Sequence, residues 1–127
     1  MFAQVPTLPP SLVRIATTPV LASETPAGFT RVKILRLPAD GAYHTLGAVR
    51  LDFSNSQTSE SASFALLKTN AAAARLARTE ASVPTGSLFQ TRAVAIGRFA
   101  IAVAAKTAPE ARTLLGLAVS HFHRSEG

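Results

Sequence analysis

The chain has 127 residues, of which 47% are hydrophobic and 16% charged, and it contains no cysteine. This length and composition are typical of one globular domain and exclude a disordered chain, disulfides, thiolate catalysis and cysteine-ligated zinc. Thirteen Lys and Arg against seven Asp and Glu give a net charge of +6. That balance favours anionic partners, although a GC-rich coding bias would produce the same excess of arginine and alanine.

The N-terminal part of the chain is rich in proline. Five of the eight prolines lie within residues 1–27. We therefore predict a proline-rich arm or linker over residues 1–27, in which residues 11–15 have the pattern of a short edge strand. A single α+β domain is expected to occupy residues 28–127.

No targeting or membrane-spanning segment is expected. The N-terminus carries no early cation, and prolines interrupt any apolar run, so it does not resemble a secretory signal. The only long apolar region is broken by four charges: Arg98, Lys106, Glu110 and Arg112. The chain is expected to be cytoplasmic by default. A mature exported domain would share these features, so the compartment stays open.

Residues 31–53 have the pattern of a β-hairpin around Asp40 and Gly41. A two-residue turn would place Arg31 opposite Arg50, a like-charge pair that is normally unfavourable. It would also place Ile34, Leu51 and Phe53 on one face of the hairpin. A change of parity within residues 32–37, from valine and isoleucine to two leucines, suggests a β-bulge.

The next segment is predicted to be a helix. Residues 54–61 are polar and rich in capping residues, so Thr58 or Ser59 is expected to begin a helix that runs to about Glu80. Two apolar stripes follow helical spacing. The first contains Phe64, Leu67, Ala71 and Ala74, and the second contains Leu66, Ala73 and Ala77.

Residues 93–105 predict a second hairpin that turns at Gly97 and Arg98. Its bulky side chains share one face: Val94, Ile96, Phe99, Ile101 and Val103. A final helix is expected to begin at Thr107, because Glu110 completes a capping box with it. Its apolar face contains Ala111, Leu114, Leu115, Ala118 and Phe122.

These elements predict the order ββαββα and an α+β two-layer sandwich. Its four-stranded antiparallel sheet would carry both helices on one face. The outer face would then hold the candidate functional residues. The interface candidates are Ala93, Ala95, Ala100, Ala102 and Ala104. The candidates for binding a ligand or anion are Arg31, Lys33 and Arg50, with Lys68 and Arg75 on the predicted helix.

The pattern favours a small non-enzymatic domain that binds a partner. The first hypothesis is a homo-oligomer that self-associates through the alanine face or through the apolar first helix, because small side chains allow close approach. One alternative is a basic module for nucleic acid or another anion, although this face lacks an aromatic residue to stack bases. Another is an enzyme of unrecognised type with a pocket between sheet and helices. The simplest alternative is an exposed sheet whose alanines are neutral filler.

No motif indicates a catalytic residue, a cofactor or a metal. His121 and His123 lie roughly 200° apart around a helix and cannot share one ion. We expect both to be solvated at the helix C-terminus, where positive charge is favourable. His44 lies beside a turn, and no acidic partner is placed by its spacing.

Overall fold

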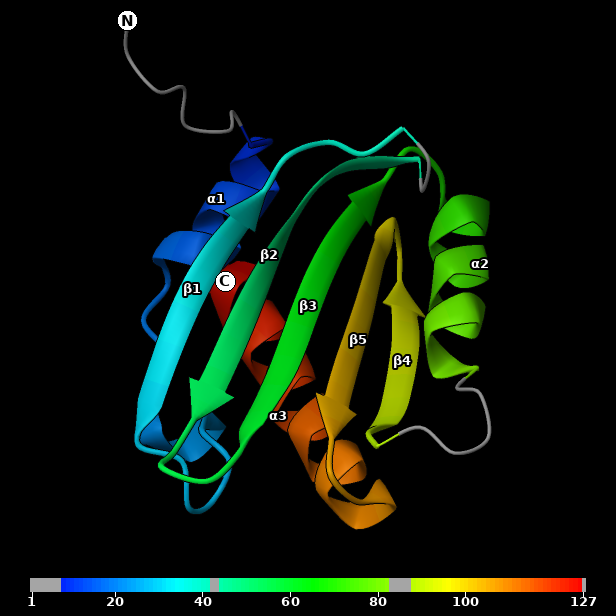
Figure 1. Cartoon of the computed structure of the whole chain (residues 1–127). Helices are drawn as coiled ribbons and strands as arrows, with labels where there is room; N and C mark the ends of the chain where they lie inside the picture. The colour runs from blue at the N-terminus through cyan, green and yellow to red at the C-terminus, as the bar shows by residue number, and fades with distance from the viewer. Residues whose placement is uncertain (1–7, 42–43, 83–87, 127) are drawn as a thin grey trace, which may run out of the picture.

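The computed structural model describes residues 8–41, 44–82 and 88–126. In chain order the elements are α1 (Pro10–Thr17), the 3-10 helix η1 (Ala22–Glu24), β1 (Arg31–Leu37), β2 (Thr45–Ser54), β3 (Ser59–Leu67), α2 (Asn70–Ala81), β4 (Gln90–Ile96), β5 (Phe99–Ala105) and α3 (Ala108–Glu126). The strands form one antiparallel sheet in the order β1-β2-β3-β5-β4 (Figure 1). The α+β class and the antiparallel sheet are confirmed. Within the described residues, however, there are five strands and three α-helices rather than four and two.

The additional strand is β3, which occupies the first half of the predicted helix. Its residues alternate, so Ala62 and Phe64 are buried on one face while serines point to the other. Strands β2 and β5 lie on either side of β3 and provide hydrogen-bond partners for its backbone. In a helix, the same backbone groups would bond to one another. Helix α2 begins after Thr69, whose Oγ1 accepts a hydrogen bond from the Ala72 amide at 3.0 Å.

The N-terminal segment also differs from the prediction. Residues 10–17 form α1 instead of an extended arm with an edge strand. Pro10 lies in the first turn, where its missing N–H costs no hydrogen bond. Leu12 and Ile15 are one turn apart and are completely buried in the core. The prolines therefore begin a helix here, and burial of its apolar side holds the helix against the sheet.

The register of one predicted hairpin is confirmed, and that of the other is shifted. The β4–β5 register is as predicted, with Ile96 opposite Phe99 and Gly97 in the left-handed region at φ +59°. In the β1–β2 pair, Val32 lies opposite Phe53 rather than Val49, because the connection is longer than a two-residue turn.

This shift in the β1–β2 pair is an even number of residues, so every side chain keeps its predicted face. Arg31 lies opposite Ser54, so the expected pair of arginines does not form. β1 also pairs without interruption, and the register irregularity lies instead between Thr45 and Gly47 of β2. The bulge predicted in β1 is therefore wrong.

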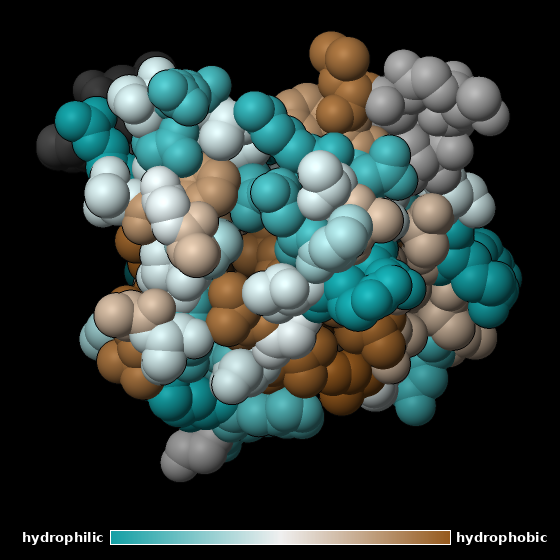
Figure 2. All heavy atoms as spheres, turned by 90° about the horizontal axis from the view of Figure 1, so that it is seen from below, coloured by the Kyte–Doolittle hydropathy of each residue, from teal (hydrophilic) through white to brown (hydrophobic). Residues whose placement is uncertain are grey.

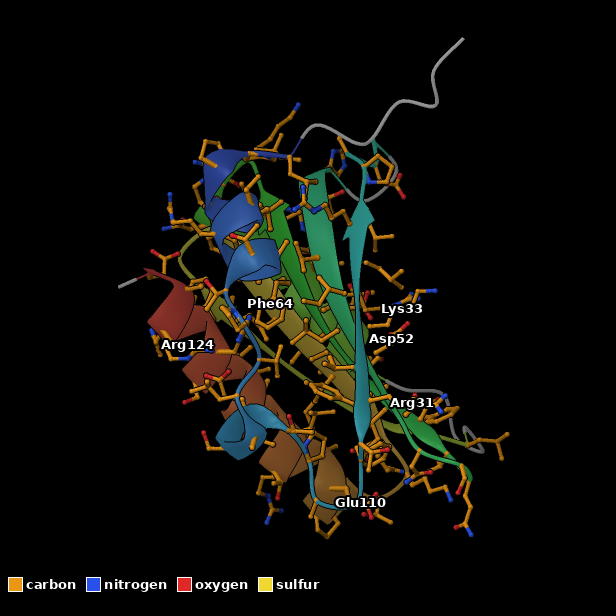
Figure 3. The ribbon with its side chains drawn as sticks, turned by 90° about the vertical axis from the view of Figure 1, so that its left-hand side faces the viewer. Arg31, Lys33, Asp52, Phe64, Glu110 and Arg124 are labelled. Carbon is orange, nitrogen blue, oxygen red and sulfur yellow. The ribbon has the colours of Figure 1, made fainter. Side chains whose placement is uncertain are left out.

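Helices cover both faces of the sheet, and the prediction of both helices on one face is wrong. The main core lies between the sheet and helices α1 and α3 (Figure 3). Its largest fully buried side chains include Leu12, Ile15, Val49, Leu51, Phe53, Phe64, Ile101 and Leu114. Helix α2 lies on the opposite face and forms a separate cluster. That cluster contains Ala65, Leu67, Ala73, Ala77 and Ala100.

The predicted helix from Thr107 is confirmed as α3. The Glu110 amide donates to Thr107 Oγ1 at 3.3 Å, and Ala111, Leu114, Ala118 and Phe122 are buried. Across the described ranges, no helix combines the length and the apolar character needed to pass through a bilayer. The sequence VPTGS of residues 83–87 predicts a turn. These residues and the first seven residues of the predicted arm lie outside the described residues.

Candidate functional site

The sheet face that carries α2 is a regular grid of mostly small side chains. Strand pairing places one residue from each strand in each row, from β1 to β4. The first row is Leu37, Ala48, Ala65, Ala100 and Ala95. The second is Leu35, Arg50, Ser63, Ala102 and Ala93. The third is Lys33, Asp52, Ser61, Ala104 and Thr91. We call this surface the α2 face.

A pocket of about 380 Å³ lies on the α2 face, between α2 and the β1–β2 connection. Its floor is formed by Ala48, Ser63 and Ala65, and its α2 wall by Leu76 and Glu80. The opposite wall is formed by Leu37, Pro38, Ala39, Asp40 and Thr45. Of the described residues that line this pocket, only Asp40 and Glu80 carry charged side chains. The pocket is therefore mainly apolar and locally acidic, in a chain whose net charge is +6.

Hydrogen bonds to the backbone hold both walls of the pocket. Asp40 and Thr45 exchange backbone N–H···O bonds of 3.2 and 3.0 Å, and the Asp40 amide also donates to Thr45 Oγ1 at 3.0 Å. On the other wall, Thr91 Oγ1 of β4 donates to the carbonyl oxygen of Glu80 at 2.7 Å. This bond ties the last turns of α2 to the sheet, so the pocket walls are held in place without a ligand.

The alanines predicted as an interface lie on the α2 face, but part of this surface is occupied by the chain itself. Ala100 is buried in the α2 cluster, and Ala93 and Ala95 pack against it. Ala102 and Ala104 are half-buried. Small side chains in β4 and β5 thus allow α2 to lie close to the sheet. Self-association through these alanines stays a prediction.

The predicted cations fall into two groups. Arg31, Lys33 and Arg50 share the α2 face, as expected from their parity. Arg50 forms a bidentate ion pair with Asp52, with distances of 2.9 Å for Nε–Oδ1 and 3.2 Å for Nη2–Oδ2. Lys33 lies directly opposite Asp52. This acid therefore offsets part of the positive charge.

The other two predicted cations, Lys68 and Arg75, lie outside strands β1 and β2. Lys68 follows the far end of β3, roughly 30 Å along that strand from Ser59, whose row contains Arg31. Arg75 lies on α2. The fold does not gather all five cations into one patch, and anion or nucleic-acid binding by this set stays a prediction.

A buried ion cluster connects the segment after α1 to α3. The Glu24 carboxylate accepts from Arg124 Nε at 2.7 Å, from Arg124 Nη2 at 2.8 Å and from the Leu21 amide at 3.1 Å. Arg124 Nη2 also donates to the carbonyl oxygen of Pro19. The hydrogen bond from Arg124 is the main reason that the pKa of Glu24 falls to about 2, although burial opposes the shift.

His121 belongs to the same cluster and is 1% exposed, so the expectation that it is solvated is wrong. Its Nδ1 lies 3.0 Å from Glu24 Oε1, and its Nε2 lies 3.1 Å from the carbonyl oxygen of Ile15. Carboxylate and carbonyl oxygens accept hydrogen bonds, so a ring nitrogen of His121 that carries a proton can donate to either of them. His123 is exposed, as expected.

A pair of acids, Glu60 and Glu110, lies at the lower end of the molecule. Glu60 on β3 is 4% exposed, and burial together with hydrogen bonding to and repulsion from Glu110 raises its pKa to about 7. A backbone hydrogen bond from Lys106 acts in the opposite direction. Both acids line a cavity of about 280 Å³ with Pro26, Ala27, Phe29, Pro109 and Thr113. Figure 2 shows hydrophobic residues exposed among hydrophilic ones at this end.

The comparisons with known proteins add no family. No family model, no curated protein and no solved structure matches the chain. In the described part of the chain, no group of three or more His, Cys, Asp and Glu side chains is arranged to hold a metal ion. The candidate site therefore rests on geometry alone.

Sequence reasoning did not identify the pocket, although one signal pointed to it. Leu35 and Leu37 have the opposite parity to Val32 and Ile34, so both faces of β1 carry large apolar side chains. In the sequence alone, this change suggests a bulge. Its structural explanation is that Leu37 lines the pocket on the α2 face.

Proposed function

We propose that this protein is a binding domain for a small, mainly apolar molecule that carries a positive charge. The ligand would occupy the pocket between α2 and the sheet. The observation that carries the proposal is the lining of that pocket, in which apolar side chains are accompanied by two carboxylates, those of Asp40 and Glu80. An ammonium or amidinium group is the ligand chemistry that complements them.

The dimensions of the pocket support this function. Small-molecule sites are concave and mostly apolar, with typical volumes of about 300–1,000 Å³ and a few polar groups that orient the ligand. The volume of about 380 Å³ lies within this range and suits a compact ligand. The hydroxyls of Thr45 and Ser63 add groups that can hydrogen-bond with it.

Three probes of one shape test the proposal: hexylammonium, hexanol and hexanoate. Titrations of the isotope-labelled protein, followed by amide NMR shifts, should give the affinity order hexylammonium, then hexanol, then hexanoate. The shifts should centre on Ala48, Ala65 and Leu76. Equal affinity for the three probes, or shifts centred elsewhere, would contradict the proposal.

Two substitutions separate the apolar part of the site from its charge. Ala48→Phe fills the floor from a half-buried position and should weaken binding of hexylammonium and hexanol alike. Glu80→Gln removes one carboxylate and should weaken hexylammonium binding about three- to tenfold while leaving hexanol unchanged. Glu126→Gln is the matched control, because it removes an exposed carboxylate from the end of α3.

A further inference from the structure

The two edges of the sheet differ in how well they are covered. Strand β4 packs against α2 and α3, and most of its residues are half-buried. The other edge, β1, is exposed over its first four residues. Val32 and Ile34 are 41% and 37% exposed, although they have the parity of the main core. Figure 3 looks directly onto this edge and shows no helix across it.

The charges of β1 are all positive. Arg31, Lys33 and Arg36 are exposed, and among the described residues none of them forms an ion pair. Cations on an edge strand discourage pairing with another copy of that strand. Two β1 strands side by side would bring two sets of three cations together without an acid. An acidic strand would instead find both unpaired backbone groups and opposite charge.

We propose that the β1 edge binds an extended acidic segment of a partner protein as a sixth strand of the sheet. Main-chain hydrogen bonds would provide much of the affinity, and side chains at alternate positions would provide the specificity. This interaction does not depend on the pocket, which lies on the α2 face.

The residues of β1 define the partner sequence. For an antiparallel partner, the residues facing Arg36, Lys33 and Arg31 should be acidic. Those facing Leu37, Leu35, Ile34 and Val32 should be apolar. In the direction of the partner chain, the pattern is apolar, acidic, apolar, apolar, acidic, apolar, acidic. This pattern is not a simple alternation, so it distinguishes register-specific pairing from attraction to negative charge alone.

The probe is a fluorescent peptide whose core is Val-Glu-Val-Val-Glu-Val-Glu, with blocked ends and Gly-Ser flanks. Anisotropy should show saturable binding to the full chain, and the largest amide NMR shifts should fall in β1. A peptide of the same composition in shuffled order should bind at least about tenfold more weakly. A version methylated at alternate backbone nitrogens should also lose binding, because it lacks the strand donors.

A charge exchange provides the decisive variant. Arg36 is exposed and lies opposite Val49, so Arg36→Glu creates no like-charge pair within the sheet. This substitution should weaken binding of the probe about tenfold, and a probe with Lys at the position facing residue 36 should restore binding. Lys33→Gln is a milder second variant, with an expected loss of about threefold. Arg75→Glu on exposed α2 surface is the control and should leave binding unchanged.

Four outcomes would overturn the proposal. The first is equal binding of the ordered, shuffled and methylated peptides. The second is a loss with Arg36→Glu that the Lys-containing probe does not restore. The third is displacement of the peptide by a short DNA duplex of equal affinity, which would indicate a site for anions in general. The fourth is a dimer in sedimentation that Arg36→Glu dissociates, which would assign the edge to a second copy.

Discussion

Glu24 and Glu60 are the same residue type and are almost equally buried, at 5% and 4% exposure, yet their pKa values move in opposite directions. The pKa of Glu24 falls to about 2, whereas that of Glu60 rises to about 7. Burial raises both. The difference therefore comes from the partners, which are chiefly Arg124, with His121, in one case and Glu110 in the other.

These opposite shifts give opposite effects of pH on stability. A carboxyl whose pKa is lowered in the folded state stabilises the protein above its unfolded pKa, and this contribution is lost as the pH falls toward the folded pKa. For Glu24 that window runs from about 4.5 down to about 2. A raised pKa acts in reverse. Glu60 therefore reduces stability as the pH rises from about 4.5 to about 7.

The largest expected effect comes from removing the acid of the first cluster. Glu24→Ala leaves the buried ring of His121 without its carboxylate partner and removes both carboxylate acceptors of Arg124. Breaking a buried ion pair by deleting one partner typically costs about 3–5 kcal/mol. Urea denaturation at pH 6 should show a loss of this size. Glu126→Ala, an exposed acid on the same helix as Arg124, should change stability by less than about 0.5 kcal/mol. A loss below about 1 kcal/mol for Glu24→Ala would mean that the cluster contributes little.

Acid titration of the unmodified chain should show the next largest effect. Stability should fall between pH 4.5 and 2 as Glu24 takes up a proton, with a contribution on the order of 3 kcal/mol. The measurement is the free energy of unfolding at several pH values. Glu24→Gln should be less stable at pH 6 but should show a flatter acid limb than the unmodified chain. Parallel acid limbs for the two proteins would assign the acid sensitivity to other groups.

The smallest effect on stability is expected from the pair of acids Glu60 and Glu110. Glu60→Gln keeps a similar shape and cannot ionise, so it should remove the decline in stability between pH 4.5 and 7. At pH 8 the variant should be more stable than the unmodified chain by about 1–2 kcal/mol, because it has no buried carboxylate at this position. The gain is no larger because, in the unmodified chain, Glu110 can turn into solvent and relieve part of the repulsion. Glu110→Gln should act in the same direction but more weakly, since Glu110 is exposed and Glu60 stays buried. A decline in stability between pH 4.5 and 7 that is as large in both variants as in the unmodified chain would refute this account.

Much of the fold followed from local pattern. The β4–β5 hairpin and α3 were predicted correctly because local signals mark them. A glycine marks the turn of the hairpin and a capping threonine marks the start of α3. Within each element the apolar residues follow one period, that of a strand in the hairpin and that of a helix in α3. The sequence of residues 59–67 wrongly predicts a helix, because Phe64 and Leu67 also fit helical spacing. The alternation of Ser59, Ser61 and Ser63 was the competing signal. Neighbouring strands decided the outcome, since a central strand gains two partners.

The candidate site could be predicted only in part. Parity placed Arg31, Lys33 and Arg50 on one face correctly, because an even shift in register keeps every residue on its face. The Arg50–Asp52 pair follows from the same parity, because the two residues are two positions apart on β2. The separation of Lys68 from Arg31 depends instead on residues 59–67 forming a strand. The pocket could not be found from the sequence, because its walls, Leu37 and Leu76, come from segments that meet only in the folded chain.

The sequence by itself determined the class of structure, the two-sided character of the β4–β5 hairpin and the start of α3, because each depends on residues close together in the chain. Only the tertiary structure decided that alanines in β4 and β5 support α2, that prolines begin α1, and that Glu24 meets partners about a hundred residues away. The physical reason is that burial and charge pairing act between segments. A local pattern shows which side chains need a partner but not which segment provides it.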